Sequence, residues 1–334
     1  MTHDMQLREG GIYMTKRRLI WRLLSVSLMA FAASLGVAQD YPTRPIRVLT
    51  SPPGGGSDFV SRLIAQGISG PLGQPVIVEN RPGGTIAGET VAKAVPDGYT
   101  LIYYGSALWL LPLMRKEVPY DTVKDFAPIS LTSMQPNIRV IHPTLPVKSV
   151  KELIALAKAR PGELNYGAGG TGSSGHLAAE LFKSMAKVNI MRIPYKGQGP
   201  ATNDLVAGHV QLTFATSGSV AGHIKSGRLR ALAVTTAQPS ALVPGIPTIA
   251  ASGVPGYEAA QISGMFAPAR TPVAIITQLN REIVRLLNRP EVKEKLFTTG
   301  VEVVASSPEA FAARVKSEIV RMGKVIREAK IRDE

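Results

Sequence analysis

Two glycine-rich loops of similar design are the parts of this sequence best suited to chemistry. The first, "SPPGGGSD" at 51–58, follows the apolar run "PIRVLT", and the second, "GAGGTGSS" at 167–174, follows "LNY". Each loop leads through hydroxyl residues into a stretch with helical spacing. Glycines allow close approach of the backbone, and the first turn of a helix has N–H groups without an internal partner. Both loops are therefore suited to hold a carboxylate or a phosphate.

The distance between the loops along the chain indicates what kind of anion they would hold. They are separated by more than a hundred residues, so we expect one loop in each of two lobes, where together they would grip both ends of a dianion. The first loop lacks the G-K-[ST] ending of a P-loop. The second spells G-x-G-x-x-G, but the following "NIMRIPYKG" offers no acidic residue for a dinucleotide ribose. The simpler alternative, two tight strand-to-helix turns without a ligand, stays open.

No constellation for catalysis accompanies the loops. The chain has neither G-x-S-x-G nor H-E-x-x-H, and it has no cysteine, which excludes thiolate metal sites and disulfides. We expect His176 to brace the loop at 169–173 rather than act as a base, because nothing pairs with it in sequence. Asp58 could be a general base, but a first-turn acid more often stabilises its own helix. No catalytic residue, metal site or cofactor is predicted.

The elements that would position the loops alternate between strand and helix. Apolar runs at 45–50, 74–80, 99–105, 164–169, 189–195, 210–216 and 229–236 read as strands, and most are followed by a turn and an amphipathic stretch. This pattern predicts an α/β fold with largely parallel sheets, and 334 residues predict two lobes. Gly105, Ser106 and the stretch "ATSGS" come at strand ends, where open α/β sheets bind ligands. The C-terminal part is helical, with a helix start at Ser306 or Ser307.

The N-terminus predicts export. After Met14, a possible true start, four basic residues precede an apolar run that is short for a membrane span, and cleavage near Ala38 fits a secretory signal at 1–38. Either the general secretory route or twin-arginine export could use it. The formal charge of +14 suits anionic ligands, whereas the scattered basic residues and sparse aromatics argue against nucleic acid.

The order of several motifs resembles a known family. "PIRVLTSPPGGGSDFVSRLIA", "VIVENRPGG", "VAKAVPDGYTL", "LNYGAGGTGSSGHLAAELF" and "IPYKGQGPATNDLVAGHVQLTF" are similar to the tripartite tricarboxylate transporter substrate-binding proteins, the Bug or TctC family, from Tyr41 to the C-terminus. Leu111, Ala215 and Ile262 depart from the usual polar or aromatic residues of that family. These departures predict a less polar, roomier pocket.

The resemblance implies a two-lobed periplasmic binding protein of α/β class, with a cleft between two sheets flanked by helices. Lobe 1 would comprise 39–138 and 255–334, and lobe 2 would comprise 139–254. The protein would be a monomer that carries a small carboxylate to a membrane permease, without catalysis. A secreted carboxylate- or ester-processing enzyme and a sensing module for a receptor remain alternatives. The expected ligand-binding residues are Pro53, Gly54, Gly55, Gly56, Ser57, Asp58, Gly105, Ser106, Ala168, Gly169, Gly170, Thr171, Ser173, Thr216 and Ser217.

Overall fold

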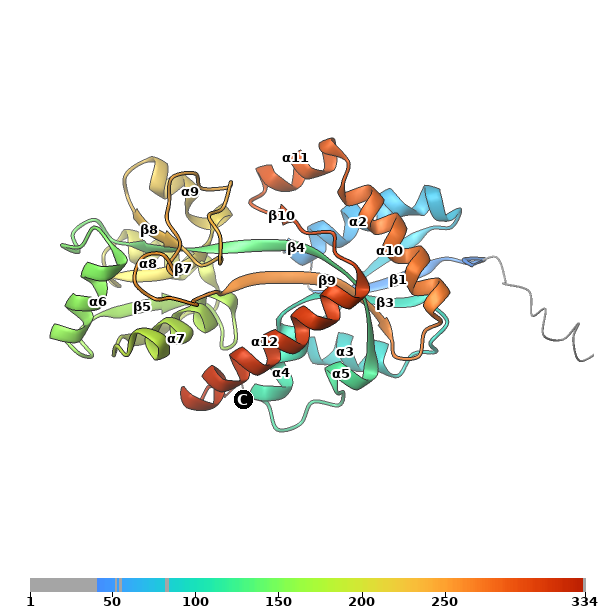
Figure 1. Ribbon diagram of the computed structural model, residues 1–334, viewed down its shortest axis with the longest axis horizontal. Coiled ribbons are helices and arrows are strands. Elements are labelled where there is room, and N and C mark those ends of the chain that lie inside the picture. Colours follow the sequence, from blue (N-terminus) through green and yellow to red (C-terminus); the bar gives the residue numbers. More distant parts are fainter. Residues whose placement is uncertain (1–40, 52, 54–55, 82–83, 333–334) are drawn as a thin grey trace, which may run out of the picture. The chain divides into compact units, whose positions relative to one another are not determined.

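The computed structural model describes residues 41–51, 53, 56–81 and 84–332. The predicted signal peptide at 1–38, and Gly54 and Gly55 of the first loop, lie outside these residues. Contacts divide the chain into a unit that ends at Thr43 and a second unit that begins at Arg44. The second unit is an α/β structure with two lobes, each built around its own part of a continuous sheet (Figure 1).

The first lobe is built on parallel strands at its outer side. β1 (Ile46–Thr50) pairs in parallel with β2 (Val76–Asn80) and with β3 (Thr100–Gly105). The inner strand β3 then pairs antiparallel with β9 (Ala260–Pro268). Because β1 and β3 run in the same direction, the loops that follow them come out at the same edge of the sheet.

The second lobe repeats this plan. β5 (Asn165–Ala168) pairs in parallel with β6 (Met191–Pro194) and with β7 (Leu212–Thr216). β8 (Arg230–Val234) pairs antiparallel with the end of β4 (Phe126–Ile141). The glycine-rich loop at 169–173 leaves the carboxyl end of β5.

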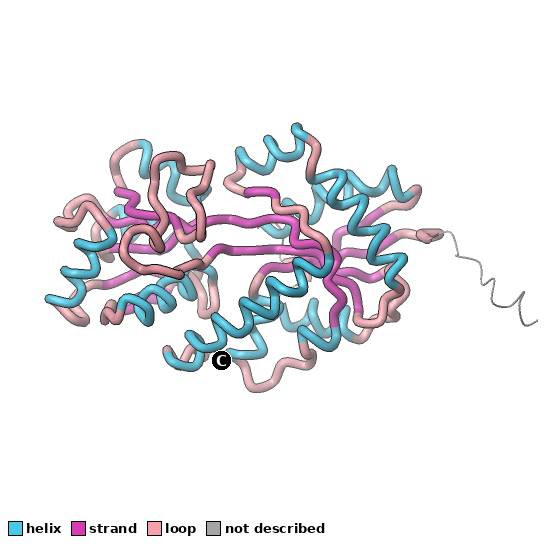
Figure 2. The backbone as a smooth tube through the Cα atoms, viewed as in Figure 1, coloured by secondary structure: helices cyan, strands magenta, loops and turns pink. Residues whose placement is uncertain are grey.

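Two long strands connect the lobes. β4 pairs with β9 from Phe126 to Pro136 and then with β7 from Asn137 to Ile141, so one strand belongs to both lobes. Figures 1 and 2 show β4 and β9 side by side between the lobes. The short β10 (Glu302–Val303) pairs with β4 in the first lobe.

Helices cover both faces of the sheets. The longest, α12 (Pro308–Glu328), packs against α4 (Ala107–Met114) and α7 (Ser174–Ala186). Aromatic rings fill the space beneath it, with the Trp109 centroid 6.0 Å from Phe266 and 6.2 Å from Phe311. The remaining helices of the described residues are α2 (Gly56–Leu72), α3 (Gly84–Ala92), α5 (Thr122–Asp125), α6 (Val150–Ala159), α8 (Gln198–Val206), α9 (Ser217–Lys225), α10 (Val273–Leu287) and α11 (Pro290–Thr298).

The expected strands and C-terminal helices are present, and the α/β two-lobed fold is confirmed. Ser307 is the N-cap of α12, where its hydroxyl accepts a hydrogen bond from Ala310 N at 3.2 Å. The expectation of largely parallel sheets is wrong for the inner strands, because β4 and β9 are antiparallel to their neighbours. The lobe boundaries at 138/139 and 254/255 stay predictions.

Candidate functional site

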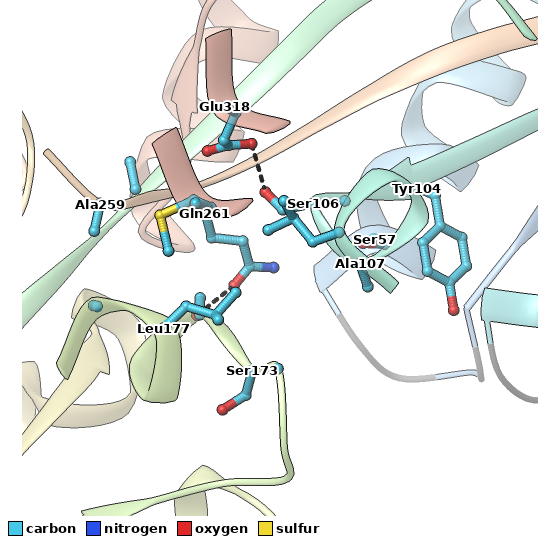
Figure 3. A pocket seen from close by; sticks show the side chains of 16 residues that line it. Ser57, Tyr104, Ser106, Ala107, Ser173, Leu177, Ala259, Gln261 and Glu318 are labelled. Atoms are coloured by element: carbon cyan, nitrogen blue, oxygen red, sulfur yellow. Dashed lines mark hydrogen bonds between the residues drawn. The ribbon is translucent and has the colours of Figure 1, made fainter. Parts of the chain in front are cut away.

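A cavity of about 290 Å³ lies where α4, α7 and α12 come together (Figure 3). Residues from both lobes line it, together with residues at the start of β9 and on α12. Of the described residues that line it, none is a lysine or an arginine. They are Ser57, Tyr104, Gly105, Ser106, Ala107, Leu110, Gly172, Ser173, Ser174, Leu177, Ala178, Ala259, Ala260, Gln261, Glu318 and Met322.

Ser57 of the first loop lines the cavity, whereas the neighbouring Asp58 does not. Asp58 is 6% exposed, and its Oδ1 accepts hydrogen bonds from Arg62 Nε at 2.9 Å and from Asn80 Nδ2 at 2.7 Å. The same Asn80 nitrogen donates to Ser51 O at 2.7 Å. Asp58 therefore fixes the start of α2 to the end of β2, and it does not line the cavity. This arrangement fits a structural acid better than a general base.

The second loop is held from behind by two side chains. His176 Nδ1 accepts a hydrogen bond from Gly172 N at 3.1 Å, which confirms the expected bracing role. Burial lowers the pKa of His176 to about 3, and the positive charges of Arg192 and Lys183 add to this effect. Arg192 donates to Gly169 O at 2.9 Å and to Thr171 Oγ1 at 3.4 Å. These bonds hold the loop in place, and its residues Gly172 and Ser173 line the cavity.

Gly172 is required in this loop for two reasons. Its φ of +76° lies in the left-handed region, which favours glycine. A Cβ at this position would also lie 2.7 Å from Met114 Cε, at the end of α4. The loop of the second lobe therefore touches α4 of the first lobe beside the cavity.

The start of α7 brings a hydroxyl to β4 and β9, the two strands that connect the lobes. Ser174 Oγ lies 3.4 Å from Asn137 Oδ1 on β4 and 3.4 Å from Gln261 Oε1 on β9. Figure 3 shows the Gln261 side chain reaching into the space between Leu177 and Ser106. The first backbone hydrogen bond along α7 runs from Leu177 N to Ser173 O, and the Ser173 hydroxyl caps the helix by accepting from His176 N at 3.4 Å. The N–H groups of Ser174 and Gly175 have no partner within the helix. Amide, hydroxyl and backbone donors thus converge at one end of the cavity.

An acid lies at the other end. Glu318 on α12 is 3% exposed, and its Oε2 accepts hydrogen bonds from Trp109 Nε1 at 2.7 Å and from Ser106 Oγ at 3.2 Å. Arg321 Nη2 is 3.9 Å from the other carboxylate oxygen. Burial raises the pKa of the Glu318 carboxyl above its ordinary value, although the hydrogen bond from Trp109 opposes the shift. A ligand anion would therefore favour the serine end over the Glu318 end.

The predicted site residues divide into two groups. Ser57, Gly105, Ser106 and Ser173 line the cavity. The other described candidates do not line it: Pro53, Gly56, Asp58, Ala168, Gly169, Gly170, Thr171, Thr216 and Ser217. Ser217 Oγ instead donates to Gly300 O at 3.3 Å, and Thr216 Oγ1 contacts Ser219 Oγ.

Several lining residues were missed by sequence reasoning. Gln261 lies on a strand that the sequence pattern did not reveal, and Glu318 lies on a C-terminal helix far from both loops. Leu111, Ala215 and Ile262 do not line the cavity. The effect of these departures on the pocket stays a prediction. The apolar part of the wall comes from α4, α7 and α12.

No group of three His, Cys, Asp or Glu side chains among the described residues could hold a metal ion. Within the same residues, no helix is both long enough and apolar enough to cross a bilayer.

Comparison with known proteins identifies the family. The model of the tripartite tricarboxylate transporter family receptor (TctC) matches residues 60–331. Protein BugT of Bordetella pertussis is 38% identical over 318 residues, which cover 92% of this chain and 97% of BugT. The chain belongs to the TctC receptor family. Members of this family are periplasmic solute-binding proteins, and the predicted resemblance is confirmed.

Two solved TctC relatives carry ligands. The R. palustris protein Rpa4515, described with adipate, is 38% identical with a TM-score of 0.74, and the match covers 87% of this chain and 99% of that protein. MatC from Rhodopseudomonas palustris, described with bound malate, is 31% identical with a TM-score of 0.70, covering 86% and 100% of the two chains. Both TctC relatives thus hold small carboxylates.

Proposed function

We propose that this TctC-family chain captures a small carboxylate in the cavity between its lobes and delivers it to the membrane permease of a tripartite tricarboxylate transporter. The observation that carries the proposal is the meeting of Ser57 and Ser173, from the helix starts of the two lobes, at one cavity. Helix starts and hydroxyls supply donors suited to a carboxylate, which needs no lysine or arginine there.

The ligand's carboxylate would sit at the serine end. We propose that it accepts hydrogen bonds from the backbone at the start of α7, from the Ser57 and Ser173 hydroxyls and from Gln261 Nε2. The apolar body of the ligand would then lie against Leu110, Leu177 and Met322.

The size of the cavity limits the ligand. Its volume of about 290 Å³ lies at the lower end of the range of about 300–1,000 Å³ that is usual for small-molecule pockets. This is the scale of a small organic acid, and adipate and malate in the two relatives support the assignment of the ligand class.

The same geometry supports binding without turnover. Asp58 accepts hydrogen bonds from Arg62 and Asn80, and His176 Nδ1 accepts one from Gly172 N. We propose that neither acts as a base and that the chain is not an enzyme. The ligand would be released unchanged.

Closure of the lobes would couple binding to delivery. The strands β4 and β9 are the connections about which lobe 1 (39–138 with 255–334) and lobe 2 (139–254) would move. A ligand that reaches donors on both sides binds the closed state better and shifts the population toward it. We propose that the exported monomer, cleaved near Ala38, presents this closed state to the permease.

Isothermal titration calorimetry with a panel of acids tests the proposal. We expect adipate, malate or benzoate to bind the purified mature chain in a 1:1 ratio, and chromatography to recover the acid unchanged. The matching primary amides should bind at least tenfold more weakly, because an amide removes the charge that helix starts favour. Failure of every acid to bind, or conversion of a bound acid to product, would contradict the proposed function.

A further inference from the structure

Arg139 on β4 is a fully buried arginine in an apolar environment. Its side chain is 0% exposed, and its guanidinium carbon lies 3.8 Å from the Phe182 ring centroid and 4.6 Å from that of Phe214. None of its three nitrogens has a hydrogen-bond partner among the described residues. Two aromatic faces stabilise a cation, but they do not neutralise it.

No acid within the described part of the chain forms an ion pair with Arg139. The titratable group that acts on it is the Tyr257 hydroxyl, whose own pKa is raised by burial, so it stays neutral. Burial lowers the pKa of Arg139 to about 9, which leaves the guanidinium charged at neutral pH. The second lobe therefore contains a buried positive charge without a counter-charge, an expensive arrangement for a protein interior.

Residues on β4 and on α7 lie between the Arg139 charge and the cavity. Asn137 and Arg139 are two residues apart on β4, so they share one face of the strand, about 7 Å apart. Asn137 accepts a hydrogen bond from Ser174, which lines the cavity. On α7, Ser174 and Phe182 are eight residues apart, about 12 Å along the helix axis.

We propose that Arg139 is a specificity-determining residue, whose buried charge favours a bound acid over a neutral solute of the same shape without touching it. The inference rests on the proposed carboxylate function. At an effective dielectric constant of about 20, a unit charge about 10 Å away changes the affinity for an anion by on the order of tenfold. Water and salt screen this interaction little because the charge is buried.

Arg139→Met tests the inference, because methionine keeps an unbranched apolar stem and removes the charge. Dissociation constants are measured for adipate, malate and benzoate and for their primary amides. For each acid that the wild type binds, we expect the variant to bind about tenfold more weakly. The dissociation constants of the amides should change less than twofold. Arg228→Met is the matched control, since Arg228 is an exposed arginine of the same lobe and its loss should leave acid affinity within twofold.

Arg139→Lys gives a second readout that does not depend on folding of the methionine variant. A buried lysine loses its proton at lower pH than a free one, so the lysine variant should bind acids nearly as the wild type does at pH 6 and lose affinity toward pH 8. The wild-type profile should stay flat over this range, which lies below the pKa of about 9 that burial gives Arg139. Equal weakening of acids and amides by Arg139→Met, an unchanged acid affinity, or a flat Arg139→Lys profile would overturn the inference. If wild type binds no acid, the proposed function fails first.

Discussion

Ser174→Pro is expected to weaken acid binding by about a hundredfold without unfolding the protein. Ser174 is the first residue of α7, where proline fits a helix because the N–H that it removes has no intrahelical partner. Ser173 has the extended backbone, with φ −61° and ψ 155°, that a residue before proline prefers. The substitution removes a backbone donor to the ligand, and a hydrogen bond to a charged group contributes about 1.5–3 kcal/mol. It also removes the hydroxyl that holds the Gln261 side chain.

Ser174→Ala is the control that separates these two donors. It removes only the hydroxyl that contacts Asn137 and Gln261, so we expect a loss of about tenfold. Calorimetry with the tightest-binding acid measures both variants, and circular dichroism verifies that α7 is retained. Equal affinities for the proline and alanine variants would show that the backbone N–H at this position does not contact the ligand.

Acidification is expected to destabilise the protein through His176. The folded pKa of about 3 lies below the ordinary value of 6.5, because burial and nearby cations disfavour the charged ring. Because the folded pKa is depressed, the unfolded state binds more protons than the folded state. The contribution of neutral His176 to the free energy of unfolding is therefore complete above about pH 6.5 and is lost as the pH falls below it. Between pH 7 and pH 4 the free energy of unfolding should fall by about 3 kcal/mol from this residue alone.

His176→Asn isolates that effect. An asparagine oxygen can accept the Gly172 N–H but does not titrate, so urea denaturation should show a shallower loss of stability between pH 7 and pH 4 for this variant. His209→Asn, at a histidine whose side chain is 70% exposed, should keep the wild-type slope. A His176→Asn slope as steep as the wild-type slope would assign the acid sensitivity to other groups.

The outer strands and the loops could be predicted because their signals are local. Each strand is a short apolar run bounded by glycine or proline, and each loop joins glycines to a helix start. The role of His176 could also be predicted, since a side chain one turn into a helix lies close to the loop before it. These features depend on residues that are neighbours in the sequence.

The connecting strands β4 and β9 could not be predicted in the same way. β4 contains Pro128 and Pro136, and proline inside an apolar run argues against a strand. In the structure, Pro128 lies at a register shift in the pairing with β9, and Pro136 lies where β4 passes from one lobe to the other. Irregular pairing thus accommodates both prolines, and long-range contacts decide the fold there.

The site residues that the sequence did not reveal are also placed by long-range contacts. Gln261 reaches the cavity only because β9 crosses between the lobes, and Glu318 only because α12 folds back over α4. Arg139 would be taken for a surface residue in a strand pattern, but its strand is covered by α7. Local sequence carries no signal for such placements.

A crystal structure of the chain with a bound acid tests the central claim most directly. We predict a carboxylate oxygen within 2.7–3.2 Å of a backbone N–H at the start of α7, with the Ser57 side of the cavity closing over the same ligand. A ligand that contacts neither helix start, or a carboxylate held instead by a lysine or arginine side chain, would contradict the account.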